Sequence, residues 1–550
     1  MKSKTLFLSA ALLLVCTAAV FAGGDQEGTE GSATAIKVTA PGTFPIVEEK
    51  VTIKVFTQKH RLVEDLNTNR FTGIYEEMTN VHFEFDVAPQ GQGEEKRNLI
   101  LASGDLPDVF MYTGMNATQM VVYGSQGVFW PLQDIIDEQS VHLKKLWTEK
   151  PFIKNDLTAP DGNIYALPQG AECFHCTAQR KMWIYQPWLD ELGLEMPETT
   201  EEYYEVLKAF RDGDPNGNGQ QDELPLVGAM ASGAGFSPHA FIMNAFQYWD
   251  DSLLIIEDGN MRFSANTPEF KNAMKYMKRL YDEGLIAPET FTQDRTQLKQ
   301  IGENPDVNIL GSSQALWYGT FVTNFGPSER YLDWRVVPPL KGPDGTRWAQ
   351  TATFRVQPHT LVAKDYEYPE VLVRWADWLY SVEGNRTANT GIKDQDWRWA
   401  REGEVNYNNI PATFFVEPHV LYKLQNERWL HTAPHFNSRE LRQGGATSQE
   451  IIEKGQEARL YKWTLEFYHP YKYPEFMPNL IFGEDEALEI GEIEPALKDG
   501  VVSAIARFVT GELDIDGDWS SYLRELDGLE WSRYVALYQD ALDAKMAAIN

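Results

Sequence analysis

The order of predicted elements at the start of the folded chain constrains its fold more than any other feature. Residues 51–56 alternate apolar and polar side chains, which predicts a strand with one buried face. A helical stretch follows at residues 69–79, and residues 82–87 form a second alternating strand. Residues 94–102 then predict a helix and residues 108–111 a short apolar strand. This β-α-β-α-β order predicts a parallel sheet covered by helices, and therefore an α/β fold.

The middle of the chain contains helices with clear start signals. Thr199 and Glu202 have the spacing of a capping box ahead of an apolar helical face. Thr267 as a cap and Pro268 at the first position open a second helix, and Gly284 closes it. The Met and aromatic stripes on these helices are interpreted as core packing and not as a cofactor site.

The N-terminus has the pattern of a secretory signal. Lys2 and Lys4 precede an apolar run at residues 6–15, and small residues lead to Ala22. We interpret residues 1–22 as a signal peptide cleaved after Ala22. A membrane anchor is the alternative, because the stretch is near the minimum spanning length of ~17 residues.

A lipid anchor at Cys16 is a third possibility, although Val15 is larger than a lipobox usually accepts before its cysteine. Residues 23–45 are rich in Gly, Glu, Ser and Thr and predict a flexible tether. About 505 residues remain, several times the ~150-residue prior for one domain, so two or more lobes are expected.

The charge of the chain excludes one class of partner. The net charge of −31 and the absence of clustered Lys and Arg argue against nucleic acid, whose phosphates require such clusters. A hydrophobic content of 43% permits large cores. No segment after the signal is long and apolar enough to span a membrane.

Apart from Cys16, the chain contains two cysteines, Cys173 and Cys176. A local disulfide is the first interpretation in an exported protein. Redox catalysis remains open, but that spacing normally begins a helix after a strand, and no helix is indicated here. A zinc site would need four ligands, and the sequence offers no second pair.

The chain resembles the extracellular solute-binding proteins of family 1, and within them the LplA-like lipoproteins and alginate-binding receptors. The matching strings are spread over nearly the whole mature chain, and their order is more specific than any one of them. They lie at residues 101–110, 188–194 with 197–199, 214–219, 283–286, and 508–514 with 518–519.

The resemblance implies a two-lobed α/β architecture of the type II periplasmic-binding-protein kind, in which each lobe is a sheet covered by helices and a cleft lies between the lobes. We expect lobe 1 to comprise residues 46–166 and about 345–430, and lobe 2 residues 167–344 and about 431–550. It further implies a monomeric, exported receptor of an ABC importer, periplasmic or at the outer face of the membrane. Its partners would be membrane permease subunits.

No catalytic set stands out in the sequence. A phosphate-binding loop and a Gly-x-Ser-x-Gly elbow are both missing, and the 10 His are scattered without metal-ligand spacing. A secreted carbohydrate-active enzyme remains the rival hypothesis, because abundant carboxylates could form a glycosidase pair. A binding protein for peptide or another solute is the second alternative.

Carbohydrate is the expected ligand. The chain contains 16 Trp, 24 Tyr and 28 Phe, and flat aromatic faces suit the apolar faces of sugar rings. The best candidates lie in loops expected to face the cleft, since ligands of open α/β sheets bind outside the carboxyl ends of the strands. These candidates are Tyr112, Trp183, Trp317, Tyr318, Trp348, Trp397 and Trp399.

The loop at residues 212–223 predicts one structural calcium ion, because calcium prefers six to eight oxygen ligands. A frame that starts at Asp212 satisfies the EF-hand pattern. A frame that starts at Asp214 matches the calcium loop of the alginate-binding relatives and is preferred. A solvated turn is the alternative, since turns favour the same residues. The preferred frame carries over to Asp214, Asn216, Asn218, the carbonyl of Gln220, Asp222 and Glu223.

Overall fold

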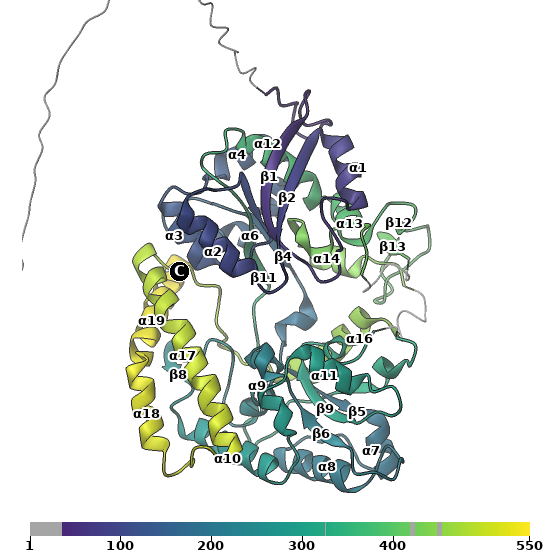
Figure 1. The fold of residues 1–550 in the computed structure, drawn as a ribbon, viewed down its shortest axis with the longest axis vertical. Helices are drawn as coiled ribbons and strands as arrows, with labels where there is room; N and C mark the ends of the chain where they lie inside the picture. Colours follow the sequence, from purple (N-terminus) through teal and green to yellow (C-terminus); the bar gives the residue numbers. More distant parts are fainter. Residues whose placement is uncertain (1–35, 325, 418–423, 448–453, 550) are drawn as a thin grey trace, which may run out of the picture.

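The computed structural model describes residues 36–324, 326–417, 424–447 and 454–549, which form two α/β lobes stacked along the long axis of the molecule (Figure 1). Lobe 1 is built around a six-stranded sheet and lobe 2 around a four-stranded sheet. The predicted two-lobed α/β fold is therefore confirmed. The predicted signal peptide and Cys16 lie outside the described residues. No helix within the described ranges is long and apolar enough to cross a membrane.

The sheet of lobe 1 has the order β14-β4-β11-β3-β1-β2. All neighbours run parallel except β11, which is antiparallel to both β3 and β4. The strands are β1 (Val51–Gln58), β2 (Val81–Ala88), β3 (Val109–Met111), β4 (Leu167–Ala171), β11 (Arg355–Val362) and β14 (His435–Asn437).

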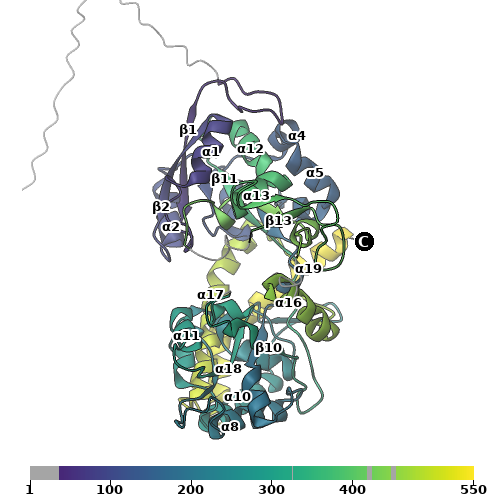
Figure 2. The same cartoon turned by 90° about the vertical axis from the view of Figure 1, so that its right-hand side faces the viewer.

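Alternation of side chains places the core of lobe 1. In β1, Ile53 and Val55 are buried while Thr52 and Lys54 are exposed, and β2 follows the same period of two. The covering helices are α1 (Arg70–Thr79), α2 (Gly93–Ser103), α3 (Ala117–Ser125), α4 (Gln133–Gln139), α5 (His142–Glu149), α6 (Pro151–Asn155), α12 (Pro369–Asp377), α13 (Val382–Thr390) and α14 (Arg439–Gln443). A two-stranded sheet of β12 (Trp397–Trp399) and β13 (Phe414–Val416) extends this lobe at one side (Figures 1 and 2).

The sheet of lobe 2 has the order β10-β5-β9-β6. Its strands are β5 (Lys181–Tyr185), β6 (Leu224–Val227), β9 (Leu310–Ala315) and β10 (Trp334–Val337), and a separate hairpin joins β7 (Leu254–Glu257) to β8 (Asn260–Phe263). Its helices are α7 (Gln186–Leu192), α8 (Thr200–Asp212), α9 (His239–Ile242), α10 (Pro268–Asp282), α11 (Arg295–Gly302) and α16 (Gln456–Trp463). The predicted capping box of Thr199 and Glu202 is present at the start of α8, and Thr267 caps α10.

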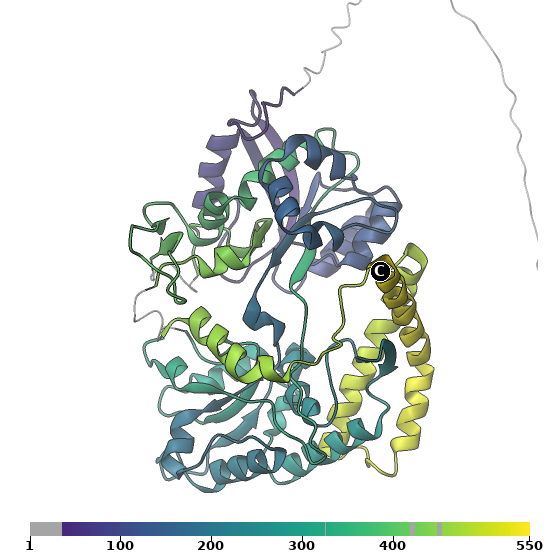
Figure 3. The same ribbon diagram turned by 180° about the vertical axis from the view of Figure 1, so that it is seen from behind.

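Three helices at the C-terminus run along the side of the molecule: α17 (Glu484–Thr510), α18 (Trp519–Gly528) and α19 (Trp531–Ile549) (Figures 1 and 3). α17 contacts α10 in lobe 2 and α3 in lobe 1. At its start, Glu484 accepts hydrogen bonds from Ser125 (2.9 Å) and Gln126 (3.2 Å). Val122 of α3 belongs to the same apolar cluster as the lobe 2 core, so α17 joins the two lobes.

The strand pairings shift the expected lobe boundaries. β4 and β14 fall in segments assigned from the sequence to lobe 2, yet both pair within the sheet of lobe 1. Leu167 and Phe436 lie in the lobe 1 core for this reason. The predicted tether also ends earlier, because the chain packs on lobe 1 from residue 36. Arg374 donates a hydrogen bond to the carbonyl of Thr43 (2.9 Å), and Val38 packs against the lobe 1 core.

Candidate functional site

The carboxyl ends of the parallel strands of lobe 1 point toward lobe 2. The chain leaves β4 at its carboxyl end, passes through a short helical turn, η1 (Phe174–Thr177), and enters lobe 2 at β5. β1, β3 and β14 run in the same direction as β4, so their carboxyl ends lie on the same side (Figure 1). Side chains at these ends are therefore the candidates for ligand contact.

Aromatic and imidazole rings gather at these strand ends. Tyr112 follows β3 directly and its ring lies 6.2 Å from that of His60 and 6.0 Å from that of His359. The rings of His431 and His435 are 5.5 Å apart. We call this region the lobe 1 wall; it comprises His60, Tyr112, Gln357, Arg386, Asn389 and His431, which keep accessible surface, and His359 and His435, which are buried.

The backbone of Tyr112 is strained. Its φ of 55° places a bulky residue in the left-handed region, which costs free energy for any residue with a Cβ. The amide of Tyr112 donates to the carbonyl of His359 (3.1 Å), which helps to hold this conformation. Strain of this kind is found mainly at functional sites, where surrounding contacts impose it.

The histidines of the wall are uncharged at neutral pH. Burial lowers the pKa of His60 to about 4, with a smaller effect from Arg61, and burial lowers that of His359 to about 3. Burial, followed by the charge of His431, also lowers the pKa of His435, which is buried. A neutral imidazole both donates and accepts a hydrogen bond, which suits a hydroxyl-bearing ligand.

An amide and guanidinium network continues the wall on α13. Arg386 donates to the side-chain oxygens of Asn385 (2.7 Å) and Asn437 (3.2 Å). Asn389 donates to the carbonyl of Asn385 (3.0 Å), while its own side-chain oxygen has no donor. Arg386 and Asn389 are half-buried, so both retain accessible surface.

A groove of about 690 Å³ lies beside the wall. It is formed by α16 of lobe 2 and by the loop between β12 and β13. The groove offers aromatic faces and cationic groups, with no carboxylate among its lining residues. They are Leu332, Arg335, Tyr407, Asn408, Lys454, Ala458, Arg459, Tyr461, Lys462, Trp463 and Leu465.

One ionic contact joins the two lobes between the wall and the groove. Arg442 of α14 in lobe 1 donates to Glu457 of α16 in lobe 2 at 2.7 Å. The Nε2 atom of His175, on the crossing turn η1, lies 3.3 Å from the same carboxylate. Arg442 and Glu457 therefore hold the lobes together on the side of the crossing chain.

Three of the aromatic candidates from the sequence are core residues. Trp183 is fully buried in β5 and donates through Nε1 to the carbonyl of Ala315 (2.9 Å). Tyr318 is fully buried against Trp183 at 5.3 Å, and Trp397 is buried in the small cluster around β12. These three side chains offer no face to a ligand, because core side chains pack against them on all sides.

The other four candidates keep accessible surface. Tyr112 and Trp317 are half-buried, and Trp317 follows the end of β9. Trp348 is half-buried and packs edge-on against Tyr473 at 5.1 Å. Trp399 is the most exposed of them at 39%, on β12.

The sequence did not identify the histidines and Arg386 of the wall. His60 and Tyr112 each lie close after a predicted strand, so the same argument applied to His60 would have found it. His431 and Arg386 carry no such signal, since pairing of distant segments brings them to the strand ends.

The calcium loop has converging oxygen groups in the preferred frame. Asp222 accepts hydrogen bonds from the side-chain amides of Asn216 (2.8 Å) and Asn218 (3.0 Å). Asp214 accepts from the backbone amides of Asn218 (3.2 Å) and Gly219 (3.0 Å). A half-turn of either amide group would present its oxygen in place of its nitrogen. The structure thus gathers Asp214, Asn216, Asn218 and Asp222 in one loop.

Glu223 at the end of this loop is the group that most needs a partner. It is 8% exposed, and neither carboxylate oxygen has a hydrogen-bond partner within the described residues. Burial raises its pKa, and the charges of Asp222 and Asp214 raise it further. The carboxylate of Asp212, by contrast, accepts two hydrogen bonds from the guanidinium of Arg211, at 2.7 and 2.9 Å. Glu223 ends the loop in both frames, and the contact of Asp212 with Arg211 favours the Asp214 frame, in which Asp212 is not a ligand.

The sulfur atoms of Cys173 and Cys176 are bonded to each other across η1. We expect the two cysteines to be oxidised in the isolated mature protein, because each thiol lies within reach of the other in one turn. The intact mass should rise by two hydrogens on reduction under denaturing conditions. Recovery of two alkylatable thiols from freshly prepared protein without reductant would show that this bond is absent.

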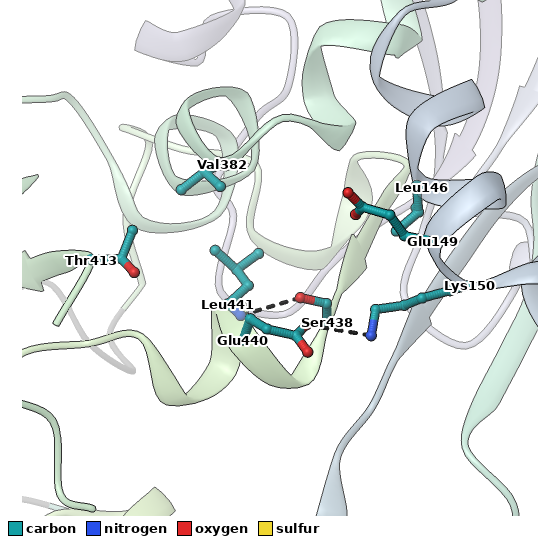
Figure 4. Close-up of a pocket in the computed structure, with 8 residues that line it drawn as sticks. All are labelled: Leu146, Glu149, Lys150, Val382, Thr413, Ser438, Glu440 and Leu441. Carbon is teal, nitrogen blue, oxygen red and sulfur yellow. Dashed lines mark hydrogen bonds and ion pairs between the residues drawn. The ribbon is translucent and has the colours of Figure 1, made fainter. Parts of the chain in front are cut away.

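A separate cavity of about 410 Å³ lies within lobe 1, between α5 and the segment around α14 (Figure 4). Lys150 points across it toward Glu440, with 3.3 Å between the charged atoms, and also pairs with Glu172 at 2.6 Å. Its cation is thus satisfied by two carboxylates. None of the candidate ligand residues lines this cavity.

Comparison with known proteins agrees with this architecture. The family model described as bacterial extracellular solute-binding protein matches residues 54–386. The chain is 30% identical over 573 positions to the fructooligosaccharide ABC transporter substrate-binding protein FusA of Streptococcus pneumoniae serotype 4 (strain ATCC BAA-334 / TIGR4), covering 100% of both chains.

Two solved structures of S. pneumoniae FusA superpose on this one. The complex with kestose has a TM-score of 0.79 at 25% identity and covers 90% of this chain and 100% of that one. The complex of an EF-hand mutant with fructo-nystose has a TM-score of 0.77 at 26% identity, with the same coverage. The chain belongs to the bacterial extracellular solute-binding protein family.

Proposed function

We propose that this protein is the receptor of an ABC importer and captures an oligosaccharide between its two lobes. The observation that carries the proposal is the likeness over 90% of the chain to FusA in complex with kestose. The lobe 1 wall supports it independently, because uncharged rings and amides at the strand ends suit sugar hydroxyls. Binding without chemistry is the function, and the ligand leaves unchanged.

The aromatic faces that contact the sugar are proposed to be Tyr112, Trp317, Trp348 and Trp399. Each keeps accessible surface, and a flat ring can cover the apolar face of a sugar while polar neighbours hold its hydroxyls. Tyr112 and Trp317 have the stronger support, because each follows the carboxyl end of a central strand.

We further propose that the loop at residues 214–223 holds one structural calcium ion. Asp214, Asn216, Asn218, Asp222 and Glu223 would supply side-chain oxygens, and Gln220 its carbonyl. The unpartnered carboxylate of Glu223 and the EF-hand named for FusA support a calcium ion in this loop, and the contact of Asp212 with Arg211 supports the frame that starts at Asp214. Bound calcium would offset two of the three negative charges of Asp214, Asp222 and Glu223 and fix the shape of the loop, far from the wall.

For location and partners we propose an exported monomer that docks on membrane permease subunits. Attachment would occur by a lipid at Cys16, or cleavage after Ala22 would release the chain.

Titration calorimetry of the mature protein against a panel of neutral and acidic oligosaccharides and peptides tests the proposal. We expect saturable binding of at least one oligosaccharide, with the bound glycan recovered intact by chromatography. Slow cleavage of the glycan would favour a carbohydrate-active enzyme. Binding of peptides alone would contradict the carbohydrate assignment.

Solution scattering with the same ligand tests closure. The radius of gyration should fall at saturation, because a ligand held by both lobes favours the arrangement in which both contact it. An unchanged radius would mean that the lobes do not close on it.

A further inference from the structure

We infer that the η1 turn, when its disulfide is reduced, is a binding site for one soft, monovalent metal cation, Cu⁺. Its ligands are the sulfur atoms of Cys173 and Cys176 and the Nδ1 atom of His175. The structure shows the oxidised turn, in which the two sulfurs are bonded to each other. The inference therefore assigns a second state to a segment that the proposed function does not use.

The three ligand atoms already converge. The two sulfurs and a ring nitrogen of His175 all lie within 4.8 Å of one another. The Nδ1 atom of His175 is 3.9 Å from the sulfur of Cys176. Cys173 and His175 are buried, while Cys176 keeps accessible surface through which a cation can enter. Two cysteines and a histidine within one turn thus face the same small volume.

A carboxylate sets the tautomer of His175. The Nε2 atom of this ring lies 3.3 Å from the carboxylate of Glu457. Arg442 is 3.4 Å from the same nitrogen, but it donates to that carboxylate at 2.7 Å and cannot accept a proton from the ring. Glu457 is therefore the acceptor for Nε2–H, and Nδ1 keeps the lone pair that a metal needs. Carboxylates orient metal-binding histidines in this way.

Contacts other than the disulfide hold the turn in place. Lys181 is fully buried and donates to the carbonyls of His175 (2.7 Å) and Ala178 at the end of η1. The carbonyl of Thr177 accepts from the amide of Ala352 (2.9 Å), which lies on the segment that returns from lobe 2 to lobe 1. Breaking the sulfur–sulfur bond therefore leaves the three ligand atoms on a turn that other contacts keep in position.

The number and kind of ligands select the cation. Thiolates and imidazole suit both Cu⁺ and Zn²⁺, but structural zinc sites are almost always four-coordinate. The part of the chain that the structure describes brings three such ligand atoms together at η1. Three soft ligands are sufficient for Cu⁺, so the turn fits this ion without a fourth group from the protein.

Binding requires reduction of the disulfide first. A dithiol transfers two hydrogens to the sulfurs of Cys173 and Cys176 and becomes a cyclic disulfide itself. Cu⁺ then bonds to both sulfurs, the two thiol protons leave to water, and copper keeps its oxidation state. The thiolates are the metal ligands, and the oxidised turn has none. Reduction therefore converts a structural turn into a metal site.

The experiment measures Cu⁺ binding to the full mature chain under argon. The protein is reduced with a water-soluble phosphine, whose phosphorus takes the oxygen of one water while the sulfurs take its two hydrogens, and the phosphine is removed by gel filtration. Competition with a coloured Cu⁺ chelator gives the affinity. X-ray absorption at the copper edge gives the sulfur and nitrogen ligands, and far-UV circular dichroism checks the fold of each protein.

Three variants and one control accompany the wild type. His175→Gln removes the imidazole, Glu457→Gln removes the carboxylate that orients it, and the double variant Cys173→Ser with Cys176→Ser removes both sulfurs. The matched control is His469→Gln, an exposed histidine near the same turn, whose ring lies 5.8 Å from that of Phe174.

We expect the reduced wild type to bind one Cu⁺ per chain through two sulfurs and one nitrogen, and the oxidised protein to lack this site. His175→Gln should weaken binding about tenfold or more and remove the nitrogen ligand. Glu457→Gln should weaken it about tenfold, as the loss of an orienting partner does, with the nitrogen ligand retained. His469→Gln should bind as the wild type does.

Three results would overturn the inference. Copper-edge data on the reduced wild type without sulfur ligands would do so before any variant is made. Wild-type affinity in the double cysteine variant would place the cation elsewhere. An unchanged affinity and nitrogen signal in His175→Gln would exclude the imidazole as a ligand. None of these results bears on the proposed capture of an oligosaccharide, which the calorimetry above tests separately.

Discussion

Removing calcium with a chelator is expected to lower the melting temperature by several degrees, and excess calcium is expected to restore it. An ion bound only by the folded state stabilises it by RT ln(1 + [L]/Kd), or about 2.7 kcal/mol at a hundredfold excess over Kd. Differential scanning calorimetry with and without chelator measures the shift, and elemental analysis of dialysed protein gives the metal content.

Two variants of the loop test the calcium ion and its frame. Glu223→Gln should abolish the calcium response, because it removes the carboxylate that has no other partner in the described chain. Asp212→Asn should retain the response, since Arg211 already occupies that carboxylate. Equal melting temperatures and metal contents with and without chelator would show that the loop is a solvated turn and binds no calcium. Loss of the response in Asp212→Asn would favour the EF-hand frame that starts at Asp212.

The free energy of unfolding is expected to fall as the pH is lowered from 6.5 to 5. Burial lowers the pKa of His359 to about 3 and that of His239 to about 4, and both are 3% exposed or less. Their folded-state values lie below the unfolded value of about 6.5, so the unfolded chain binds more protons in this window. The contribution of the two neutral rings to the free energy of unfolding is complete above pH 6.5. It is lost on acidification, by about 2 kcal/mol for each ring at pH 5.

Chemical denaturation at each pH gives this dependence. The variant with both His239→Gln and His359→Gln should show a shallower fall between pH 6.5 and 5. This window is chosen because most exposed carboxylates, with pKa values of about 4, stay ionised in it. An unchanged slope in the double variant would assign the acid sensitivity to other groups.

The elements of lobe 1 could be predicted because their sequence pattern is local. Alternation in β1 and β2 follows directly from one buried face, and Gly104 ends α2 with a φ of 71° as a helix-closing glycine does. Gly384, by contrast, lies inside α13 and does not end a helix. A Cβ there would meet the carbonyl oxygen of Trp378 at 2.1 Å, so close packing and not a turn requires the glycine.

The site could be predicted only where it depends on local pattern. The proposed calcium loop is ten consecutive residues, and Tyr112 directly follows its strand, so the sequence could propose both, and both stay predictions. β5 is buried on both faces, so its sequence does not alternate between apolar and polar residues. Without that alternation, the sequence does not mark Trp183 as a core residue. His431 comes near α13, the helix of Arg386, because the turn at Leu430–Thr432 packs against that helix, which no spacing in the sequence records.

The position of α17 has a consequence for how the molecule is made. Its residues Leu497, Val501 and Phe508 complete the core of lobe 2, although the strands of that lobe all come earlier in the chain. The sheet of lobe 1 likewise lacks its edge strand until β14 has been synthesised. During synthesis lobe 1 cannot complete its sheet before β14 emerges, and lobe 2 cannot complete its core before α17 emerges. A chain shortened before α17 would expose apolar surface in lobe 2 and lose the contact that ties it to lobe 1.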